Sequence, residues 1–276
     1  MSYKTILVHC DVSKSLSHRL VVAADLAQRF GARLIGFHVR RPFETPAFLE
    51  GGFAMGDFFK SYDEGVKADE TEASAAFVKV SKGKEIATEW RVADGYVDRA
   101  FGVQARYADL VVVGQAGPEP TPTPSDLPET VALTTGRPVL VVPYIGAKPP
   151  GTIVLLCWNA SREAARAAAD ALPFLKAAQQ VIVLVVSPTA SAGGHGTEPG
   201  ADAAAWLARH GVKVTVQRDV APDADVGGVI LSRTADHDAG LIVMGIYGHS
   251  RMREMVLGGV SRTLLASMTV PIFMSH

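Results

Sequence analysis

The chain has 276 residues, of which 48% are hydrophobic and 20% are charged, and its formal net charge is −1. This length is enough for two ordinary domains, and the composition excludes an intrinsically disordered chain. The near-zero charge argues against binding to nucleic-acid backbones or acidic membranes, because both require clustered positive charge.

The N-terminal residues read as a strand and not as a targeting segment. The apolar run Ile6–His9 is too short for a secretory signal, and no apolar run approaches the length of a membrane span. We therefore expect a cytoplasmic protein that does not bind membranes. Cys10 and Cys157 form no disulfide framework and are expected to pack as small residues, and no metal-ligand spacing is present.

Short apolar, β-branched runs alternate with helical patterns through the first half. The run Thr5–Cys10 predicts a buried strand, and Asp11 follows it, placed either to cap the next helix or to contact a ligand. That helix is predicted over Ser13–Phe30 and ends at Gly31. Three further strand patterns are Leu34–Val39, Ala108–Gly114 and Arg137–Val142.

The same series of patterns recurs in the second half. Ile153–Ser161 resembles the first strand and turn, and a second helix is predicted over Ser161–Ala178, with a kink at Pro173. The later strands match segments Val181–Val186, Ala239–Gly245 and Val270–Ser275.

The first half is longer between its second and fourth strands. We expect the extra residues in the Phe-rich stretch Pro42–Tyr62, which is predicted to form a lid packed on its own domain. A cover over a hydrophobic ligand or a partner is the alternative.

The repeat predicts two tandem domains, residues 1–146 and 147–276, joined through the Pro- and Gly-containing segment Pro143–Gly151. Because strands alternate with helices, each domain is expected to be an α/β unit with a doubly wound parallel sheet. The last strands, Pro138–Val142 and Pro271–Ser275, are apolar, so we expect them to pair and form an intramolecular pseudo-dimer. A further homodimer stays open.

A glycine-rich connection in the second half is the strongest candidate for a binding site. The strand Leu241–Met244 ends in Gly245 and Gly248, and nine residues later Gly258 and Gly259 open a helix. Parallel sheets bind ligands at the carboxyl ends of their strands. Glycines let the backbone approach an anion, and a helix start offers free N–H groups. Each piece alone is an ordinary turn, but together they predict a phosphate-binding loop.

The stretch from Asp238 to Met274 resembles the C-terminal signature of the universal stress protein family, whose ATP-binding pattern is Gly, two residues, Gly, nine residues, Gly and then Ser or Thr. The resemblance covers nearly the whole chain in a tandem form. It implies a five-stranded, Rossmann-like (adenine nucleotide alpha hydrolase-like) sheet in each domain and a stress-related role. It also implies binding of ATP, with or without Mg²⁺, and slow or absent turnover. The implied ligand-binding residues are Asn159, Val186, Met244, Gly245, Tyr247, Gly248, Gly258, Gly259, Val260 and Ser261.

Two residues of this set depart from the family pattern. Gly259 stands where the family has a hydroxyl residue, although Ser261 retains a hydroxyl nearby. Asn159 stands where the family has Asp, so this side chain can hydrogen-bond but carries no charge.

The first half keeps only part of the pattern. Asp11, Val39, Gly114 and Gly117 are retained, but Leu127 and Pro128 replace the glycine pair. The intervening loop contains prolines, which donate no N–H, together with two acidic residues that repel phosphate. We therefore predict that the first site is degenerate and that one nucleotide binds per chain.

No set of side chains suited to catalysis follows from the sequence. There is no lysine after the glycines and no base paired with a nucleophile. The prediction is a nucleotide-binding protein and not an enzyme. The main alternative is an interaction scaffold of the same fold that binds no nucleotide, and an ATP-using enzyme of related fold is the third reading.

Overall fold

The computed structural model describes residues 2–43, 55–119, 121, 123–147, 150–187, 197–221, 225–246 and 259–276. The elements of the first half are β1 (Thr5–His9), α1 (Leu16–Phe30), β2 (Arg33–Arg40), α2 (Met55–Ser81), β3 (Thr88–Asp94), α3 (Val97–Gln104), the 3-10 helix η2 (Ala105–Tyr107), β4 (Leu110–Gly114), α4 (Leu127–Thr135) and β5 (Val139–Val142). Those of the second half are β6 (Ile153–Cys157), α5 (Arg162–Asp170), α6 (Leu172–Ala177), β7 (Gln180–Val186), α7 (Ala201–Arg209), β8 (Val214–Asp219), α8 (Val226–Asp236), β9 (Leu241–Gly245), α9 (Gly259–Ser267) and β10 (Ile272–Ser275).

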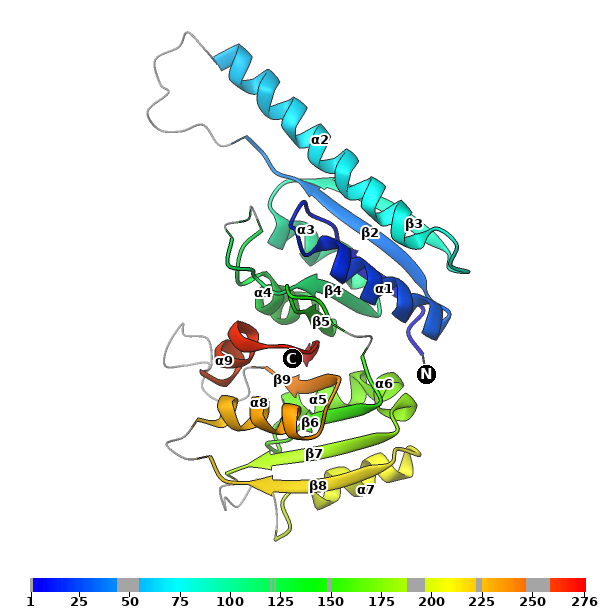
Figure 1. Ribbon diagram of the computed structural model, residues 1–276, viewed down its shortest axis with the longest axis vertical. Coiled ribbons are helices and arrows are strands. Elements are labelled where there is room, and N and C mark those ends of the chain that lie inside the picture. The colour runs from blue at the N-terminus through cyan, green and yellow to red at the C-terminus, as the bar shows by residue number, and fades with distance from the viewer. Residues whose placement is uncertain are drawn as a thin grey trace.

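The strands form one 10-stranded sheet in the order β3-β2-β1-β4-β5-β10-β9-β6-β7-β8 (Figure 1). Within each half the strands are parallel, and the order in the second half repeats that of the first. The predicted α/β class, with two doubly wound, Rossmann-like units of five parallel strands, is confirmed.

The two units meet at their last strands. β5 and β10 pair antiparallel, with Leu140 opposite Phe273 in the register. Both side chains are fully buried. The predicted pairing of the last strands is therefore confirmed, and each strand covers what would otherwise be an apolar edge.

Helices cover both faces of this sheet, as the alternating side chains of a buried strand require. Ile6 and Val8 of β1 join the core under α1, α2, α5, α6 and α7. Leu7, between them, joins the core under α3, α4, α8 and α9. Each face thus carries one continuous apolar layer that runs through both halves.

The first predicted helix is present, and the second is divided. α1 ends at Gly31, which adopts the left-handed conformation (φ 61°) that glycine tolerates best. The second helix breaks at Ala171, between α5 and α6, because Pro173 lacks the N–H that would continue the ladder. The predicted kink at Pro173 is thus a break two residues earlier.

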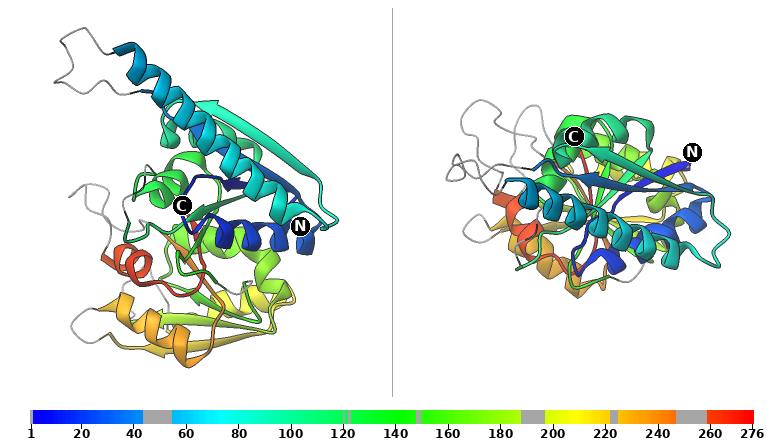
Figure 2. Two further views of the ribbon diagram at one scale, coloured as in Figure 1. Left: turned by 45° about the horizontal axis from the view of Figure 1, so that its top comes forward. Right: turned by 90° about the horizontal axis from the view of Figure 1, so that it is seen from above.

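The extra length of the first half lies mainly in a helix, so its placement in Pro42–Tyr62 was only partly right. Residues 44–54 of the predicted lid lie outside the described residues. α2 has 27 residues, whereas its counterpart α7 has 9. The views from two further sides show α2 lying along the sheet and projecting past it (Figure 2). Phe58 and Phe59 on α2 are 51% and 45% exposed, so these two rings are not packed into the domain core.

Two properties of the described residues bear on the class of protein. No helix in them combines the length and the apolar character that crossing a membrane requires. Cys10 and Cys157 are unpaired, and burial raises the pKa of each thiol to about 12. Both thiols are therefore protonated at neutral pH, which agrees with a packing role.

Candidate functional site

In the first half, Asp11 is the centre of a polar network at the carboxyl end of β1. Its carboxylate accepts hydrogen bonds from Arg19 Nη2 at 2.6 Å, Ser13 Oγ at 2.6 Å and Thr123 Oγ1 at 3.1 Å. Arg19 also donates from Nε to the carbonyl oxygen of His9 at 2.8 Å. The segment before α1, the buried face of α1 and the loop after β4 are thereby all bound to one carboxylate.

The charges of this network are balanced within it. Burial raises the pKa of Asp11, but Arg19, His9 and the hydrogen bonds outweigh burial and hold that pKa well below its usual value. Burial lowers the pKa of His9 to about 4, with Asp11 opposing the shift. At neutral pH the site therefore holds an ionised Asp11–Arg19 pair beside an uncharged His9.

Of the two roles left open for Asp11, a helix cap and a ligand contact, the structure does not show the cap. The residue before α1 is Ser15, and Asp11 accepts instead from the backbone N–H of Ser13 at 3.2 Å. Asn159 makes the same turn with the N–H of Ser161 at 3.2 Å, and Ser161 is the residue that caps α5. In both halves the residue that follows the strand thus forms an Asx turn, in which its side chain accepts a hydrogen bond from the backbone N–H two residues later.

Gly114 of the first half packs against the Arg19 guanidinium. A Cβ on Gly114 would lie 2.2 Å from Arg19 Nη1. A Cβ on Gly117 would meet only Tyr144, at an ordinary 3.8 Å. Of these two glycines, Gly114 is thus the one that a buried side chain requires.

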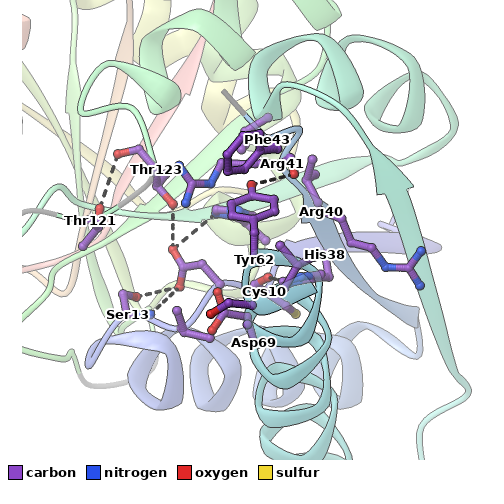
Figure 3. Close-up of a pocket in the computed structure, with 18 of the residues that line it drawn as sticks. Cys10, Ser13, His38, Arg40, Arg41, Phe43, Tyr62, Asp69, Thr121 and Thr123 are labelled. Carbon is purple, nitrogen blue, oxygen red and sulfur yellow. Dashed lines mark hydrogen bonds and ion pairs between the residues drawn. The ribbon is translucent and has the colours of Figure 1, made fainter. Parts of the chain in front are cut away.

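Two cavities lie on either side of this network. The larger, of about 440 Å³, lies between the ends of β1 and β2 and the helix α2. Figure 3 shows Thr121 and Thr123 at one side of it, Tyr62 and Asp69 at another and His38 between the strands and the helix. The smaller, of about 260 Å³, lies between the start of α1 and the residues after β4, including Gly117 and Glu119.

The predicted residues of the second half divide between strand ends and a helix start. Met244 is buried in the core, Val186 is half-buried at the end of β7, and Asn159 is exposed after β6. Gly245 closes β9, and a Cβ there would lie 2.4 Å from the backbone carbonyl carbon of Glu163. The structure therefore brings Gly245 against the first turn of α5, two residues beyond the capping Ser161.

The helix α9 begins at the predicted phosphate residues. Gly259, Val260 and Ser261 form its first turn, with Gly259 exposed and Ser261 buried. The space that a Cβ on Gly259 would occupy is open. Tyr247, Gly248 and Gly258 lie outside the described residues.

Two functional contacts were not anticipated from the sequence. Arg19 is a charged residue on the apolar face of a helix, and that anomaly was the only signal of its pairing with Asp11. Gln115 follows Gly114 and donates from Nε2 to the carbonyl oxygen of Leu265 in α9 at 2.7 Å. Nothing in the local pattern pointed to this bond, which links the first-half site to the helix that carries Gly259.

Comparison with known proteins finds a family match over the second half of the chain. Residues 152–276 match a family described as Universal stress protein family. No curated protein matches the chain.

Among solved structures, a universal stress protein from Archaeoglobus fulgidus is 16% identical and covers 98% of this chain and 95% of its own, with a TM-score of 0.72. A putative universal stress protein from Pseudomonas aeruginosa is 16% identical and covers 99% of this chain and 93% of its own, with a TM-score of 0.56. Both share the fold over its full length. A universal stress protein from A. fulgidus in complex with dAMP is 18% identical and covers 51% of this chain and 98% of its own, with a TM-score of 0.35.

Proposed function

We propose that this chain, which belongs to the universal stress protein family, binds ATP in its second half and senses or stores the nucleotide without turning it over. The role that we propose is part of a cytoplasmic stress response. The observation that carries the proposal is the family match to residues 152–276, the half that holds the spaced glycines Gly245, Gly248, Gly258 and Gly259.

The described residues of the second half are compatible with a phosphate group at α9. The first turn of a helix has backbone N–H groups without intrahelical partners, and these groups bind anions. Because Gly259 is exposed and the space beside its Cα is open, a ligand can approach this backbone. Any Mg²⁺ would take its oxygen ligands mainly from the phosphates and water, as this ion usually does.

A scaffold that binds no nucleotide is the second candidate, and Glu163 favours it. Its side chain is only 3% exposed, and its backbone, in the first turn of α5, packs against Gly245. Burial raises the pKa of Glu163, but the hydrogen bonds from Arg162, Ser161 and the backbone and the charge of Arg162 together outweigh burial, so the pKa lies below its usual value. A buried carboxylate at this point would repel a phosphate.

One direct measurement separates the two candidates. The purified protein is denatured, and any small molecule that it releases is identified by mass spectrometry. Release of an adenine nucleotide in about equimolar amount supports the proposal. If the protein releases none and calorimetry detects no binding of added ATP, the scaffold is the correct reading.

The location of the site is tested by a matched pair of variants. Gly258→Asp places a side chain and a negative charge where backbone should meet phosphate, and we expect it to weaken ATP binding more than about tenfold. Gly117→Asp makes the same change in the first half, where the neighbouring Tyr144 leaves ordinary space, and should leave affinity nearly unchanged. Titration calorimetry should give one nucleotide per chain. Equal losses, or two nucleotides per chain, would contradict the asymmetry.

Turnover of the bound nucleotide is predicted to be slow or absent. Hydrolysis needs a positioned water and stabilisation of charge on the leaving oxygen, and we assign no residue to either task. Phosphate release should stay far below a typical enzyme rate of about 10 per second. A rate near that value that disappears in Gly258→Asp would identify an enzyme instead.

A further inference from the structure

We propose that the larger cavity of the first half binds a small aromatic molecule that carries an N–H or O–H donor and no phosphate, the chemical class of indoles and phenols. The site and its ligand are distinct from the nucleotide proposed for the second half. Three features of the cavity lead to this class: its walls, one acceptor atom and its charge balance.

One side of the cavity is apolar and aromatic. Val39 lies at the end of β2, Val97 begins α3, and α2 contributes Phe58, Tyr62 and Val66. Phe43 completes this side, with its ring 4.6 Å from that of Phe59 and 5.1 Å from that of Tyr62. A volume of about 440 Å³ falls in the range of small-molecule sites, and aromatic walls favour a flat ring.

His38 offers a hydrogen-bond acceptor to this cavity. Its Nδ1 lies 2.8 Å from the carbonyl oxygen of Cys10, and because a carbonyl only accepts, Nδ1 must carry the hydrogen. In the uncharged imidazole Nε2 is then a bare acceptor, and it has no hydrogen-bond partner among the residues that the structure describes. The ring is 5% exposed and stacks on Trp90 at 6.3 Å and 15°, so its orientation is defined. A ligand that fills the cavity must supply a donor to Nε2 or leave it unsatisfied.

The charges that line the cavity do not favour phosphate. Arg40 is bound to Glu70 at 2.7 Å and lies 3.6 Å from Asp94. Asp11 is bound to Arg19, and His9 is uncharged at neutral pH because burial lowers its pKa to about 4. The two remaining charged side chains, Arg41 and Asp69, have opposite signs. A polyphosphate would find no net positive charge here, whereas an uncharged ring would pay no electrostatic penalty.

The test compares two probes that share a ring system and differ at the ring nitrogen, which carries a hydrogen in one and a methyl group in the other. Indole carries an N–H, and 1-methylindole has the same ring system without it. Titration calorimetry on the full chain should show indole binding about tenfold or more tightly than 1-methylindole, the effect of one hydrogen bond to an otherwise unsatisfied acceptor. Saturating ATP should leave indole binding unchanged. Equal affinities, displacement of indole by ATP, or no binding of either indole or phenol at millimolar concentration would overturn the proposal.

Two variants of His38 test whether its Nε2 accepts the hydrogen bond from the probe. In His38→Asn the amide nitrogen can keep the bond to the Cys10 carbonyl, but no atom replaces Nε2, so the preference for indole over 1-methylindole should disappear. In His38→Gln the amide oxygen can occupy the place of Nε2 and should retain most of the preference. An unchanged preference in His38→Asn would contradict the assignment.

A third variant leaves His38 in place, in case both substitutions unfold the chain. Val66→Trp, on the half-buried wall of α2, should fill the cavity and remove binding of both probes while ATP binding stays as in the original protein. Retained binding of indole in this variant would place the probe elsewhere and overturn the proposal. If the chain binds no ATP at all, the indole results still decide this site independently.

Discussion

At the end of β1, Asp11 and Arg19 form a buried ion pair, and His9 lies beside it. The Asp11 and Arg19 side chains are 15% and 3% exposed, and their charges compensate each other at 2.6 Å. Breaking such a pair by removing one partner typically costs about 3–5 kcal/mol, because the other charge stays buried. His9 lies beside the pair with Nδ1 3.7 Å from the Asp11 carboxylate, and burial keeps this imidazole uncharged.

His9 makes the stability of the fold depend on pH. Its pKa falls from 6.5 in the unfolded chain to about 4 in the folded one, so between these values the unfolded state binds the extra proton. The stabilisation is complete above about pH 6.5 and is lost as the pH falls to 4, with a total of about 3 kcal/mol. Urea unfolding of the original protein and of His9→Phe, which keeps a buried ring, should diverge over this window. Parallel stability curves for the two proteins would show that His9 does not titrate as described.

The contact between β9 and α5 gives Gly245 a structural role apart from any ligand. The helix passes so close to the strand end that a Cβ on Gly245 would lie 2.4 Å from the Glu163 carbonyl carbon and 2.5 Å from the Ala164 nitrogen. Both are backbone atoms, so no side-chain rotation can relieve the overlap. The glycine that begins the family's phosphate pattern is therefore also the residue that lets α5 pack.

This dual role predicts different effects for two glycine substitutions. Gly245→Ala should lower the free energy of unfolding by about 1–3 kcal/mol without nucleotide present, as overpacking does. Gly259→Ala, in the open first turn of α9, should be neutral or stabilising by up to about 1 kcal/mol, because Ala favours the helix. Denaturant titrations of the apo variants measure both. Equal losses would mean that the α5 contact does not constrain Gly245.

Across the whole molecule, the antiparallel β5–β10 pair turns two units into one sheet whose remaining edges are β3 and β8. These two strands are half-exposed and carry charged residues, among them Arg91 and Arg218. Charges on edge strands oppose further pairing, so the sheet ends there. Tyr3 also joins the halves, because its hydroxyl donates to the carbonyl oxygen of Asp170 at 2.7 Å. Within the second half, Ser275 donates to the carboxylate of the same Asp170 at 2.6 Å.

Separating the halves should expose the joint. A fragment of residues 1–146 leaves the apolar β5 (Val139–Val142) unpaired, and we expect it to self-associate through that edge. Sedimentation velocity should show that the fragment forms dimers or larger species at concentrations at which the full chain, whose β5 is paired, does not associate in this way. A folded, monomeric fragment would show that β5 does not need a partner strand.

Much of the architecture could be predicted because its determinants are local or repeated. The apolar runs, their alternation with helices and their recurrence in the second half identified the doubly wound fold and every strand except the edge strands β3 and β8. The apolar character of the last strands, together with the family resemblance, predicted the pairing of β5 with β10. The break near Pro173 was predictable because a missing N–H acts within one turn of its own helix. The length of α2 was not, since a continuous polar helix and an irregular insertion have similar composition.

The character of the candidate sites depended on contacts between distant residues. Arg19 fills the space beside Gly114, and α5 fills the space beside Gly245, so glycines in equivalent positions of the repeat are needed for different neighbours. The aromatic rings after β2 line a cavity with His38 because α2 passes over the strand ends, which no periodicity indicates. The hydrophobic pattern of a sequence determines which face of a helix or strand is buried. The close packing of the elements in the folded chain determines which atoms contact that face, and a local sequence pattern does not contain this information.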